Sequence, residues 1–471
     1  MNYRKKVTLL LLCLSLLSGC FSAEPRADIA YIYNRAAMSE ESGRNPVIVI
    51  PGILGSRLVD TIEGDAIWGS FRGTFADPAT AEGLRKVAMP LLIGDDINDV
   101  TTNAEAVGVL GRIEVSLLSL PIELNAYYNI LKTLGIGGFR DEELGKAETV
   151  DYGEDHFTCF QFPYDWRRDI TYNAARLDDF IKEKKRYVEA EHKKRFGKHH
   201  DVKFTLVAHS MGSLLARYYL RYGGHTLQHD QVDPRLSWAG TENVSKTILI
   251  GPPNGGSIVS FWDSIHGKNF SLITPNYPAA LLASFPSIYQ LLPRPRFGAY
   301  YLGSNTDKIV DIYDAKVWEQ YGWGLVDPEQ DVVLQKLLPG VDSKEERKQI
   351  VFGYLQKALA RSKRVHNLLD SPATLPDNFK MNVFIGDALQ TPSAVTIKDD
   401  GEIALANHVP GDGLVPRSSA LLDKRLAGEW SPRLQTDLSW SNVTFLNAEH
   451  LELTESPTFS NNVLYQLLES P

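Results

Sequence analysis

Short apolar runs recur along the chain, separated by stretches in which apolar residues return with helical spacing. The first run, Val47–Ile50, is rich in β-branched residues and stops at Pro51-Gly52, as a buried strand does at a sharp loop. Five further runs carry few charges: residues 158–162, 202–208, 246–250, 381–385 and 442–446. Helical periodicity lies between several of them, notably over 174–195 and 214–221. This alternation predicts an α/β protein with a mostly parallel sheet and helices on both faces.

Two stretches depart from this alternation. Residues 61–120 are rich in loop residues, with Trp68, Phe71 and Phe75 near glycines. Residues 258–375 have a helical and aromatic pattern with no clear strand. Each stretch is compatible with a cap over a site and with an insertion that packs on the sheet, and the sequence leaves both alternatives open.

The N-terminus has the pattern of an export signal. Residues 4–6 are basic and precede an apolar run over 7–17 that is too short to cross a bilayer as a stable helix. The run ends in Leu17-Ser18-Gly19-Cys20, which resembles the bacterial lipobox, where the cysteine becomes the first mature residue and carries acyl chains. We therefore expect a membrane anchor at Cys20; the alternative is an ordinary secretory peptide with an incidental cysteine.

Composition is that of a globular protein. The 471 residues are 43% hydrophobic and 23% charged, which suffices for a large core. The net charge of −9 is spread along the chain, and glutamates interrupt its densest basic stretch, so nothing predicts nucleic-acid binding. Cys13 lies in the signal and Cys20 would carry lipid, which leaves Cys159 as an inert core thiol without a disulfide partner. Phe21 after the lipid-bearing cysteine favours the outer membrane if the cell is Gram-negative.

The candidate chemistry begins at Ala208-His209-Ser210-Met211-Gly212. This motif follows a predicted strand and precedes a predicted helix, which is the context of a nucleophile elbow. Small residues at both ends let the backbone turn tightly, and the following helix adds positive potential beneath an oxyanion. We therefore predict Ser210 as a nucleophile, with a helix N-cap serine as the alternative, and His209 as a packing residue.

A serine hydroxyl needs a base to take its proton and a carboxylate to orient that base. After such an elbow, the acid and then the histidine follow the serine in the chain. Asp412 lies between two glycines, and His450 is the only histidine beyond it. We predict this pair as acid and base over two competitors: Asp387, which ends a strand, and His408, which breaks the expected chain order.

Backbone amides must receive the negative charge that forms during attack on a carbonyl. The predicted donors are Met211, next to the nucleophile, and Ile53, in the loop Pro51-Gly52-Ile53-Leu54-Gly55 after the first strand. The alternative for this loop is a plain glycine turn.

Five motifs in this order resemble the lecithin:cholesterol acyltransferase family. They are residues 47–58, Phe162-Pro163-Tyr164-Asp165-Trp166-Arg167, residues 208–212, Gly251-Pro252-Pro253-Asn254-Gly255-Gly256-Ser257 and residues 411–416. The resemblance spans residues 46–455. It implies an α/β-hydrolase fold with a helical cap and a lid-like loop region, activity on the acyl esters of lipids, and no metal or organic cofactor.

The resemblance also assigns residues. It matches Ser210, Asp412 and His450 to the family's triad, Ile53 and Met211 to its oxyanion donors, and Asp165-Trp166-Arg167 to a brace of the core. The chain lacks cysteines near the first motif, where secreted animal members pin the lid with a disulfide, and no motif marks a sterol site. The expected organisation is a signal peptide at 1–19, a lipidated tether at 20–45, hydrolase core at 46–257 and 379–471, and a cap insertion at 258–378.

The expected activity is that of a membrane-tethered serine lipase, phospholipase or O-acyltransferase that works through an acyl-enzyme. Its substrate would be a lipid or another acyl ester, and no obligate protein partner is evident. A carboxylesterase or polyester hydrolase would share every residue named. A protein of another class, a non-catalytic lipid-binding envelope lipoprotein on a hydrolase scaffold, would keep the fold without the geometry of the triad.

Overall fold

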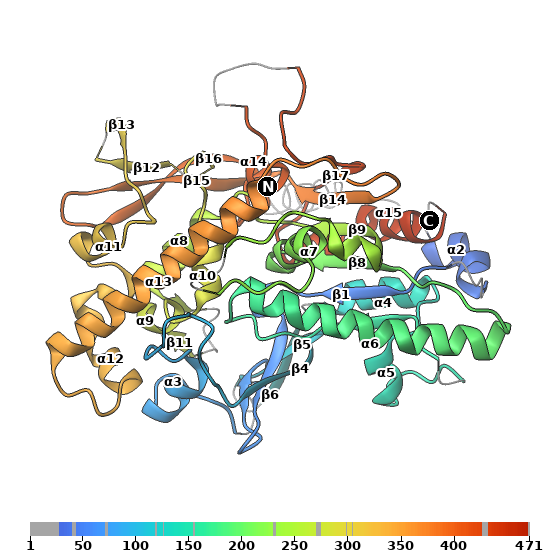
Figure 1. Ribbon diagram of the computed structural model, residues 1–471, viewed down its shortest axis with the longest axis horizontal. Coiled ribbons are helices and arrows are strands. Elements are labelled where there is room, and N and C mark those ends of the chain that lie inside the picture. The colour runs from blue at the N-terminus through green and yellow to red at the C-terminus, as the bar shows by residue number, and fades with distance from the viewer. Residues whose placement is uncertain are drawn as a thin grey trace, which may run out of the picture.

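A six-stranded parallel sheet forms the centre of the molecule (Figure 1). Its strand order is β17-β14-β9-β8-β1-β7. The strands are β1 (Val47–Ile50), β7 (Cys159–Gln161), β8 (Phe204–His209), β9 (Val244–Ile250), β14 (Lys380–Gly386) and β17 (Asn442–Leu446). Each of the six predicted apolar runs contains or overlaps one of these strands, so the predicted parallel sheet is confirmed.

The computed structural model describes residues 28–39, 44–70, 74–117, 120–125, 127–153, 156–228, 232–269, 275–297, 299–303, 305–425 and 432–469. The predicted signal peptide, the predicted lipid site at Cys20 and the aromatic residue Phe71 lie outside these residues. Among the helices that are described, none combines the length and the apolar character needed to cross a bilayer.

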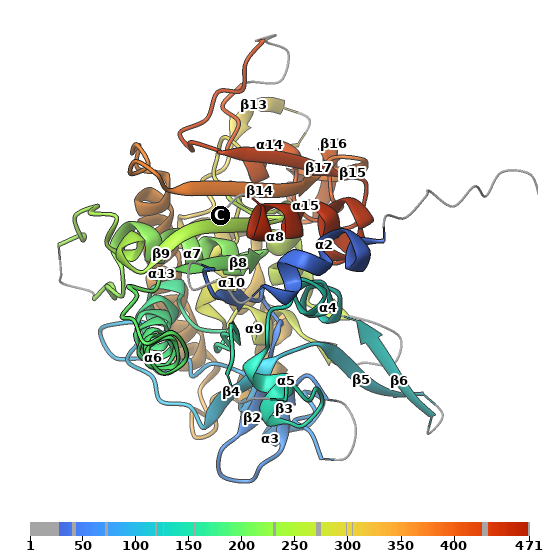
Figure 2. The same cartoon turned by 90° about the vertical axis from the view of Figure 1, so that its right-hand side faces the viewer.

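Helices cover both faces of the sheet because both alternating sets of strand side chains are apolar. Along β1, Ile48 and Ile50 join one hydrophobic cluster, and Val47 and Val49 join a second cluster on the opposite face. The first cluster includes α6 (Ile170–Phe196) and α7 (Met211–Tyr222), and the second includes α2 (Ile29–Met38), α4 (Tyr128–Ile136) and α15 (Pro457–Leu468). Figure 2 shows these two groups on either side of the strands.

The region predicted to be rich in loops contains short antiparallel strands. They are β2 (Ser56–Asp60), β3 (Ala66–Trp68) and β4 (Ala104–Val109) in one sheet, and the hairpin of β5 (Arg112–Leu117) and β6 (Leu120–Asn125). The short helix α3 (Ala81–Val87) lies between β3 and β4 in the chain, and α5 (Glu142–Lys146) follows β6 and α4.

The prediction that residues 258–375 contain no strand is wrong. The pair β10 (Lys268–Asn269) and β11 (Asn276–Tyr277) lies in this segment, as do β12 (Ala299–Leu302) and β13 (Asn305–Ile309). The second two strands join β15 (Leu389–Ile397) and β16 (Ile403–Gly411) in a four-stranded sheet. β12 pairs in parallel with β15, about ninety residues further on, so the pairing depends on a partner outside the segment.

The rest of this segment is helical, as predicted. It contains α8 (Ile258–His266), α9 (Ala279–Leu282), α10 (Pro286–Gln290), α11 (Ala315–Tyr321), α12 (Asp331–Leu337), α13 (Lys344–Asp370) and the 3-10 turns Gly324–Val326 and Pro328–Gln330. Most of its buried aromatic residues belong to the same hydrophobic cluster as α6 and α7, whereas Phe297 packs in a small cluster with Leu422 and Leu438. The division of the chain at 258 and 378 stays a prediction. Beyond it lie α14 (Arg417–Leu421) and the 3-10 turn Glu452–Glu455; another 3-10 turn, Ala239–Glu242, precedes β9.

The long helix α13 runs diagonally across this segment in Figure 1, and its last turn is held by α7. Arg217 donates to the carbonyl of Leu369 at 2.7 Å, and the Tyr222 hydroxyl donates to that of Leu368 at 2.8 Å. Arg221 donates to the carbonyl of Ser371. These side chains satisfy backbone acceptors that the end of a helix leaves without an intrahelical partner.

Candidate active site

Ser210 lies at a tight turn between β8 and α7. Its backbone has φ 51° and ψ −125°, a strained conformation for a residue with a side chain. The turn requires glycine at position 212, because a methyl group there would lie 2.3 Å from the carbonyl oxygen of Pro51. The structure therefore has the predicted elbow, with Ser210 at its tip.

The three predicted triad residues lie within hydrogen-bond distance of one another. His450 Nε2 is 2.9 Å from Ser210 Oγ, and His450 Nδ1 is 2.8 Å from Asp412 Oδ2. All three side chains are buried, and the backbone N–H of His450 also donates to the carbonyl of Asp412 at 3.0 Å. Residues that are distant in sequence are thus brought together in the order serine, histidine, carboxylate.

Hydrogen bonds around Asp412 fix the roles of both nitrogens of His450. Asp412 Oδ1 accepts from the amides of Leu414 at 3.0 Å and Val415 at 2.7 Å. A carboxylate can only accept, so Nδ1 carries the proton and donates to Oδ2. Nε2 then presents its lone pair to the Ser210 hydroxyl, which is the tautomer that a general base needs.

The two competitors lie elsewhere. Asp387 is 3.3 Å from Arg417, in a partly exposed ion pair. His408 is exposed on β16, where it pairs with Pro392. Asp412 is favoured by packing as well, because a methyl group at Gly386 would lie 2.6 Å from its Cβ. Glycine at position 386 therefore leaves room for the Asp412 side chain at the end of β14, and a larger residue there would collide with it.

The loop 51–55 passes directly over the nucleophile. A methyl group at Gly52 would lie 2.7 Å from Ser210 Cβ. Aromatic side chains hold the loop at both ends: the Tyr164 hydroxyl donates to the Pro51 carbonyl at 2.8 Å, and Trp68 Nε1 donates to the Leu54 carbonyl at 2.7 Å. These two hydrogen bonds to loop carbonyls distinguish the loop from a plain glycine turn.

The predicted oxyanion donors flank Ser210. Ile53 lines the same cavity as Ser210, and Met211 is the first residue of α7. Within the part of the chain that the structure describes, neither amide donates a hydrogen bond to another protein group. Both amides are therefore available to a ligand, and their role as donors stays a prediction.

The cavity above Ser210 has a volume of about 200 Å³ and is lined largely by apolar side chains. Leu282, Phe285, Ile288 and Leu291 come from the helical segment 258–375, and Trp166 comes from the loop after β7. Asp263 and Lys268 form an ion pair among the residues that line the cavity. The helical segment therefore forms part of the wall of the site.

The segment Asp165-Trp166-Arg167 braces the core, as expected. Arg167 is fully buried and makes bonds of 2.9 Å and 2.8 Å to the carboxylate of Asp165, and it also donates to the carbonyl of Val87 at 2.8 Å. The place of Trp166 in the cavity wall was not predicted. Cys159 is buried, and burial together with Asp141 raises the pKa of its thiol, in agreement with an inert core residue.

His209 is more than a packing residue. Its Nδ1 is 3.0 Å from the Tyr127 hydroxyl, and its Nε2 is 3.1 Å from the backbone carbonyl of His450. The Tyr127 hydroxyl also accepts from the amide of Gly52 at 2.7 Å. No sequence motif marks Tyr127; the only signal for this cluster was the place of a histidine beside the nucleophile.

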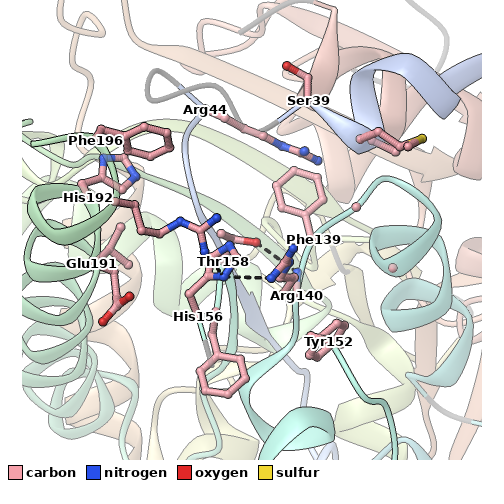
Figure 3. A pocket seen from close by; sticks show the side chains of 17 residues that line it. Ser39, Arg44, Phe139, Arg140, Tyr152, His156, Thr158, Glu191, His192 and Phe196 are labelled. Atoms are coloured by element: carbon pink, nitrogen blue, oxygen red, sulfur yellow. Dashed lines mark hydrogen bonds between the residues drawn. The ribbon is translucent and has the colours of Figure 1, made fainter. Parts of the chain in front are cut away.

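A second cavity, of about 410 Å³, lies between the end of α2, the loop after α4 and the end of α6 (Figure 3). There His156 Nδ1 is 2.8 Å from Arg140 and also contacts Arg195, while Arg44 lies over the ring of Phe139. Guanidinium groups only donate, so this imidazole nitrogen accepts. Ser210, Asp412 and His450 do not line this cavity, and we assign no catalysis to it. Among the described residues, no group of His, Cys, Asp and Glu is arranged to hold a metal ion.

Comparison with known proteins settles the family. The family model described as lecithin:cholesterol acyltransferase matches residues 147–385, just over half of the 471-residue chain. The chain belongs to this family. Membership places it among ester hydrolases and acyltransferases, with a lipid or another acyl ester as substrate. No curated protein sequence matches the chain.

Three solved structures resemble the chain to different degrees. The structure described as the Tle4–Tli4 complex has 16% identity and a TM-score of 0.52, over 91% of this chain and 99% of the other. Lipase 1 from Pelosinus fermentans has 13% identity and a TM-score of 0.36, over 90% and 99%. EstA from Clostridium botulinum has 10% identity and a TM-score of 0.32, over 90% and 87%. The last two superpose too loosely to support an argument, and the first agrees with the α/β-hydrolase fold of this family member.

Proposed function

We propose that the protein is a serine-dependent hydrolase or O-acyltransferase of lipid acyl esters, with Ser210 as nucleophile, His450 as base and Asp412 as acid. The observation that carries the proposal is the position of His450, whose two ring nitrogens lie 2.9 Å from the Ser210 hydroxyl and 2.8 Å from the Asp412 carboxylate. Nδ1, which carries the proton, faces the carboxylate, and Nε2, which carries the lone pair, faces the hydroxyl.

The mechanism follows from these contacts. Ser210 Oγ attacks the ester carbonyl while His450 Nε2 takes its proton, and Asp412 stabilises the imidazolium that forms. The carbonyl oxygen becomes an oxyanion beside the amides of Ile53 and Met211, each of which typically contributes about 3 kcal/mol to the transition state. The carbon–oxygen bond then breaks, His450 gives the proton to the leaving alcohol, and the acyl group stays on Ser210. Water or a second alcohol, deprotonated by His450, completes the cycle.

The cavity supports a lipid acyl chain as the acyl donor. Its apolar lining, from Trp166 and the helices α9 and α10, favours a hydrocarbon chain over a polar acyl group. The same lining supports a lipase, a phospholipase or a transacylase in preference to an esterase for short polar esters. A silent lipid-binding scaffold is disfavoured because the buried triad retains its full set of hydrogen bonds.

The nucleophile can be tested with a fluorophosphonate probe. We expect the wild type to become labelled and Ser210→Ala to stay unlabelled. Ser213→Ala is the matched control. Ser213 is a buried serine in the first turn of α7, and its hydroxyl donates to the carbonyl of Ala208 at 2.9 Å. Equal labelling of wild type and Ser210→Ala, or no labelling of folded wild type, would reject the proposal.

Substrate class can be tested by chain-length profiling. Rates on p-nitrophenyl esters of increasing acyl length and on phospholipid vesicles should rise from short to long chains. A carboxylesterase would instead prefer the shortest esters and leave vesicles intact. Adding an alcohol acceptor and measuring ester against free fatty acid separates acyl transfer from hydrolysis.

We also propose that Cys20 is lipidated and tethers the enzyme to a membrane of the cell envelope, which is the outer membrane if the cell is Gram-negative. The support is the sequence Leu17-Ser18-Gly19-Cys20 behind a basic and apolar signal. Cells fed an alkynyl fatty acid should yield labelled wild type and unlabelled Cys20→Ser, with Cys159→Ser labelled as a control. Label on Cys20→Ser would contradict this assignment, and fractionation of the envelope would locate the labelled protein.

A further inference from the structure

A chain of hydrogen bonds connects the loop over the nucleophile to the backbone of His450. It runs from the amide of Gly52 to the Tyr127 hydroxyl at 2.7 Å, from that hydroxyl to His209 Nδ1 at 3.0 Å, and from His209 Nε2 to the carbonyl of His450 at 3.1 Å. Tyr127, His209 and His450 are buried and line the active-site cavity, and Gly52 is buried as well. None of these contacts belongs to the triad itself.

The direction of each bond is fixed by chemistry. The His450 carbonyl can only accept, so His209 Nε2 carries a proton. Burial beside His450 lowers the pKa of His209 to about 3, so the ring is neutral and Nδ1 has a free lone pair. The Tyr127 hydroxyl must then donate to Nδ1, while it accepts from Gly52. Desolvation raises the pKa of Tyr127, which keeps this hydroxyl protonated.

Packing places Tyr127 in direct contact with the loop 51–55. A methyl group at Gly55 would lie 2.7 Å from the Tyr127 ring, and one at Gly52 would lie 2.7 Å from Ser210 Cβ. The loop is therefore enclosed between Tyr127 on one side and Ser210 on the other. The rings of His209 and His450 are also in contact, with centroids 4.9 Å apart.

We propose that Tyr127 and His209 are positioning residues that hold the oxyanion loop in register with His450. The inference rests on the proposed function. Tyr127 fixes the amide of Gly52, and so the direction of the neighbouring Ile53 amide, while His209 fixes the backbone from which the catalytic imidazole extends. Charge would thus develop at an oxygen whose donors are already oriented relative to the base.

The test is Tyr127→Phe, which removes one hydroxyl and keeps the ring. Removing an oxyanion donor lowers kcat by about a hundred- to a thousandfold, and misdirecting one should cost less, roughly ten- to a hundredfold. KM should change less than about twofold, because the loss falls on the transition state. The Ki of an alkyl trifluoromethyl ketone, which forms a tetrahedral adduct with the serine, should rise by the same factor as kcat falls.

Tyr222→Phe is the matched control. It removes a buried tyrosine hydroxyl that donates to a carbonyl at 2.8 Å, at the opposite end of α7 from Ser210. It should lower the melting temperature by an amount similar to Tyr127→Phe and leave kcat and Ki unchanged. If Tyr127→Phe retains the wild-type kcat and Ki, or if Tyr222→Phe reproduces its losses, the positioning role is wrong.

A double-mutant cycle tests whether the two residues act together. His209→Gln retains a donor near Nε2 but loses the acceptor for Tyr127, so the double variant should lose little more than the worse single variant. Fully additive losses in kcat would refute the connected chain.

Hydrogen exchange supplies a readout independent of catalysis. The Gly52 amide should be protected in the wild type and in Ser210→Ala, and should exchange faster in Tyr127→Phe. Unprotected Gly52 in the wild type would overturn the inference even if the enzyme is active. Conversely, protection lost in Tyr127→Phe would support the chain of bonds even if Ser210 proved not to be the nucleophile.

Discussion

Replacing Asp412 by asparagine should reverse the tautomer of His450. Asp412 Oδ1 accepts from two amides, those of Leu414 and Val415. An asparagine in the same rotamer must keep its oxygen toward these two donors, because its NH2 group cannot accept from them. The NH2 group then replaces Oδ2 and faces His450 Nδ1, which lies 2.8 Å away in the wild type.

The magnitude follows from this orientation. A donor facing Nδ1 requires a lone pair there, so the proton moves to Nε2, which is the nitrogen 2.9 Å from Ser210 Oγ. Nε2 then donates to the hydroxyl and no longer accepts its proton. An equivalent wrong tautomer in serine proteases lowers kcat by about 10⁴-fold, which corresponds to roughly 5 kcal/mol of transition-state stabilisation.

The assay is the rate of p-nitrophenyl ester hydrolysis near neutral pH, with thermal unfolding measured to confirm the fold. Asp387→Asn is the matched control, because Asp387 also follows a strand end and contacts Arg417 instead of His450. It should keep nearly full activity. The reasoning fails if Asp412→Asn stays within about tenfold of the wild type, or if Asp387→Asn loses as much.

Three further predictions concern the cavity, the core and pH. Leu282→Trp, in the apolar wall of the cavity, should shift the preference of the enzyme to esters with shorter acyl chains, while rates on the shortest ester stay near the wild type. An unchanged chain-length profile would show that the acyl group lies elsewhere. Arg361→Ala should lower the free energy of unfolding by about 3–5 kcal/mol, because it leaves the buried carboxylates of Asp96 and Asp169 without their cation. Arg364→Ala, which removes a more exposed ion pair with Asp233, should lower it by less than about 1 kcal/mol. Urea unfolding measures both values, and equal losses would contradict the burial argument. Burial lowers the pKa of His209 to about 3, below the roughly 6.5 of an unfolded histidine, so the unfolded state binds more protons between these two pH values. The free energy of unfolding should therefore fall as the pH decreases from about 6.5 to about 3. His209→Gln should reduce the slope of the free energy of unfolding against pH by up to about 1.4 kcal/mol per pH unit, and an unchanged slope would mean that the ring is protonated in the folded protein.

The central sheet could be predicted because its strands are apolar on both faces. The inner strands bury apolar side chains on both faces because helices cover the two sides, whereas the edge strand β17 exposes Asn442 and Phe445. In the second sheet, strand β16 was missed for the opposite reason. β16 is exposed along most of its length and contains Asn407, His408 and Pro410, so its sequence looks like a loop. Its pairing with β15 is a tertiary property.

The triad could be predicted because each member lies in a local sequence of recognisable shape: a strand–serine–helix turn, an aspartate between glycines, and a lone histidine after the last strand. Tyr127 has no such local signature. It reaches the active site because the chain around β5 and β6 returns to the loop after β1, where the Tyr127 amide donates to the carbonyl of Leu110 at 3.2 Å. Such long-range returns leave no periodicity in the sequence, and His209 was accordingly interpreted as packing alone.

The helix that begins next to the nucleophile also ends against the last turn of α13. α7 has 12 residues, so Arg217 and Tyr222, which donate to the last carbonyls of α13, lie about 10 Å and about 18 Å along the helix from Ser210. A chimaera that exchanges the helical segment for that of another hydrolase would therefore leave Arg217, Arg221 and Tyr222 facing foreign backbone. Transferring the segment together with these three residues would keep the hydrogen bonds between α7 and the end of α13. Successful exchange of the segment should therefore depend on α7 as much as on the two splice points.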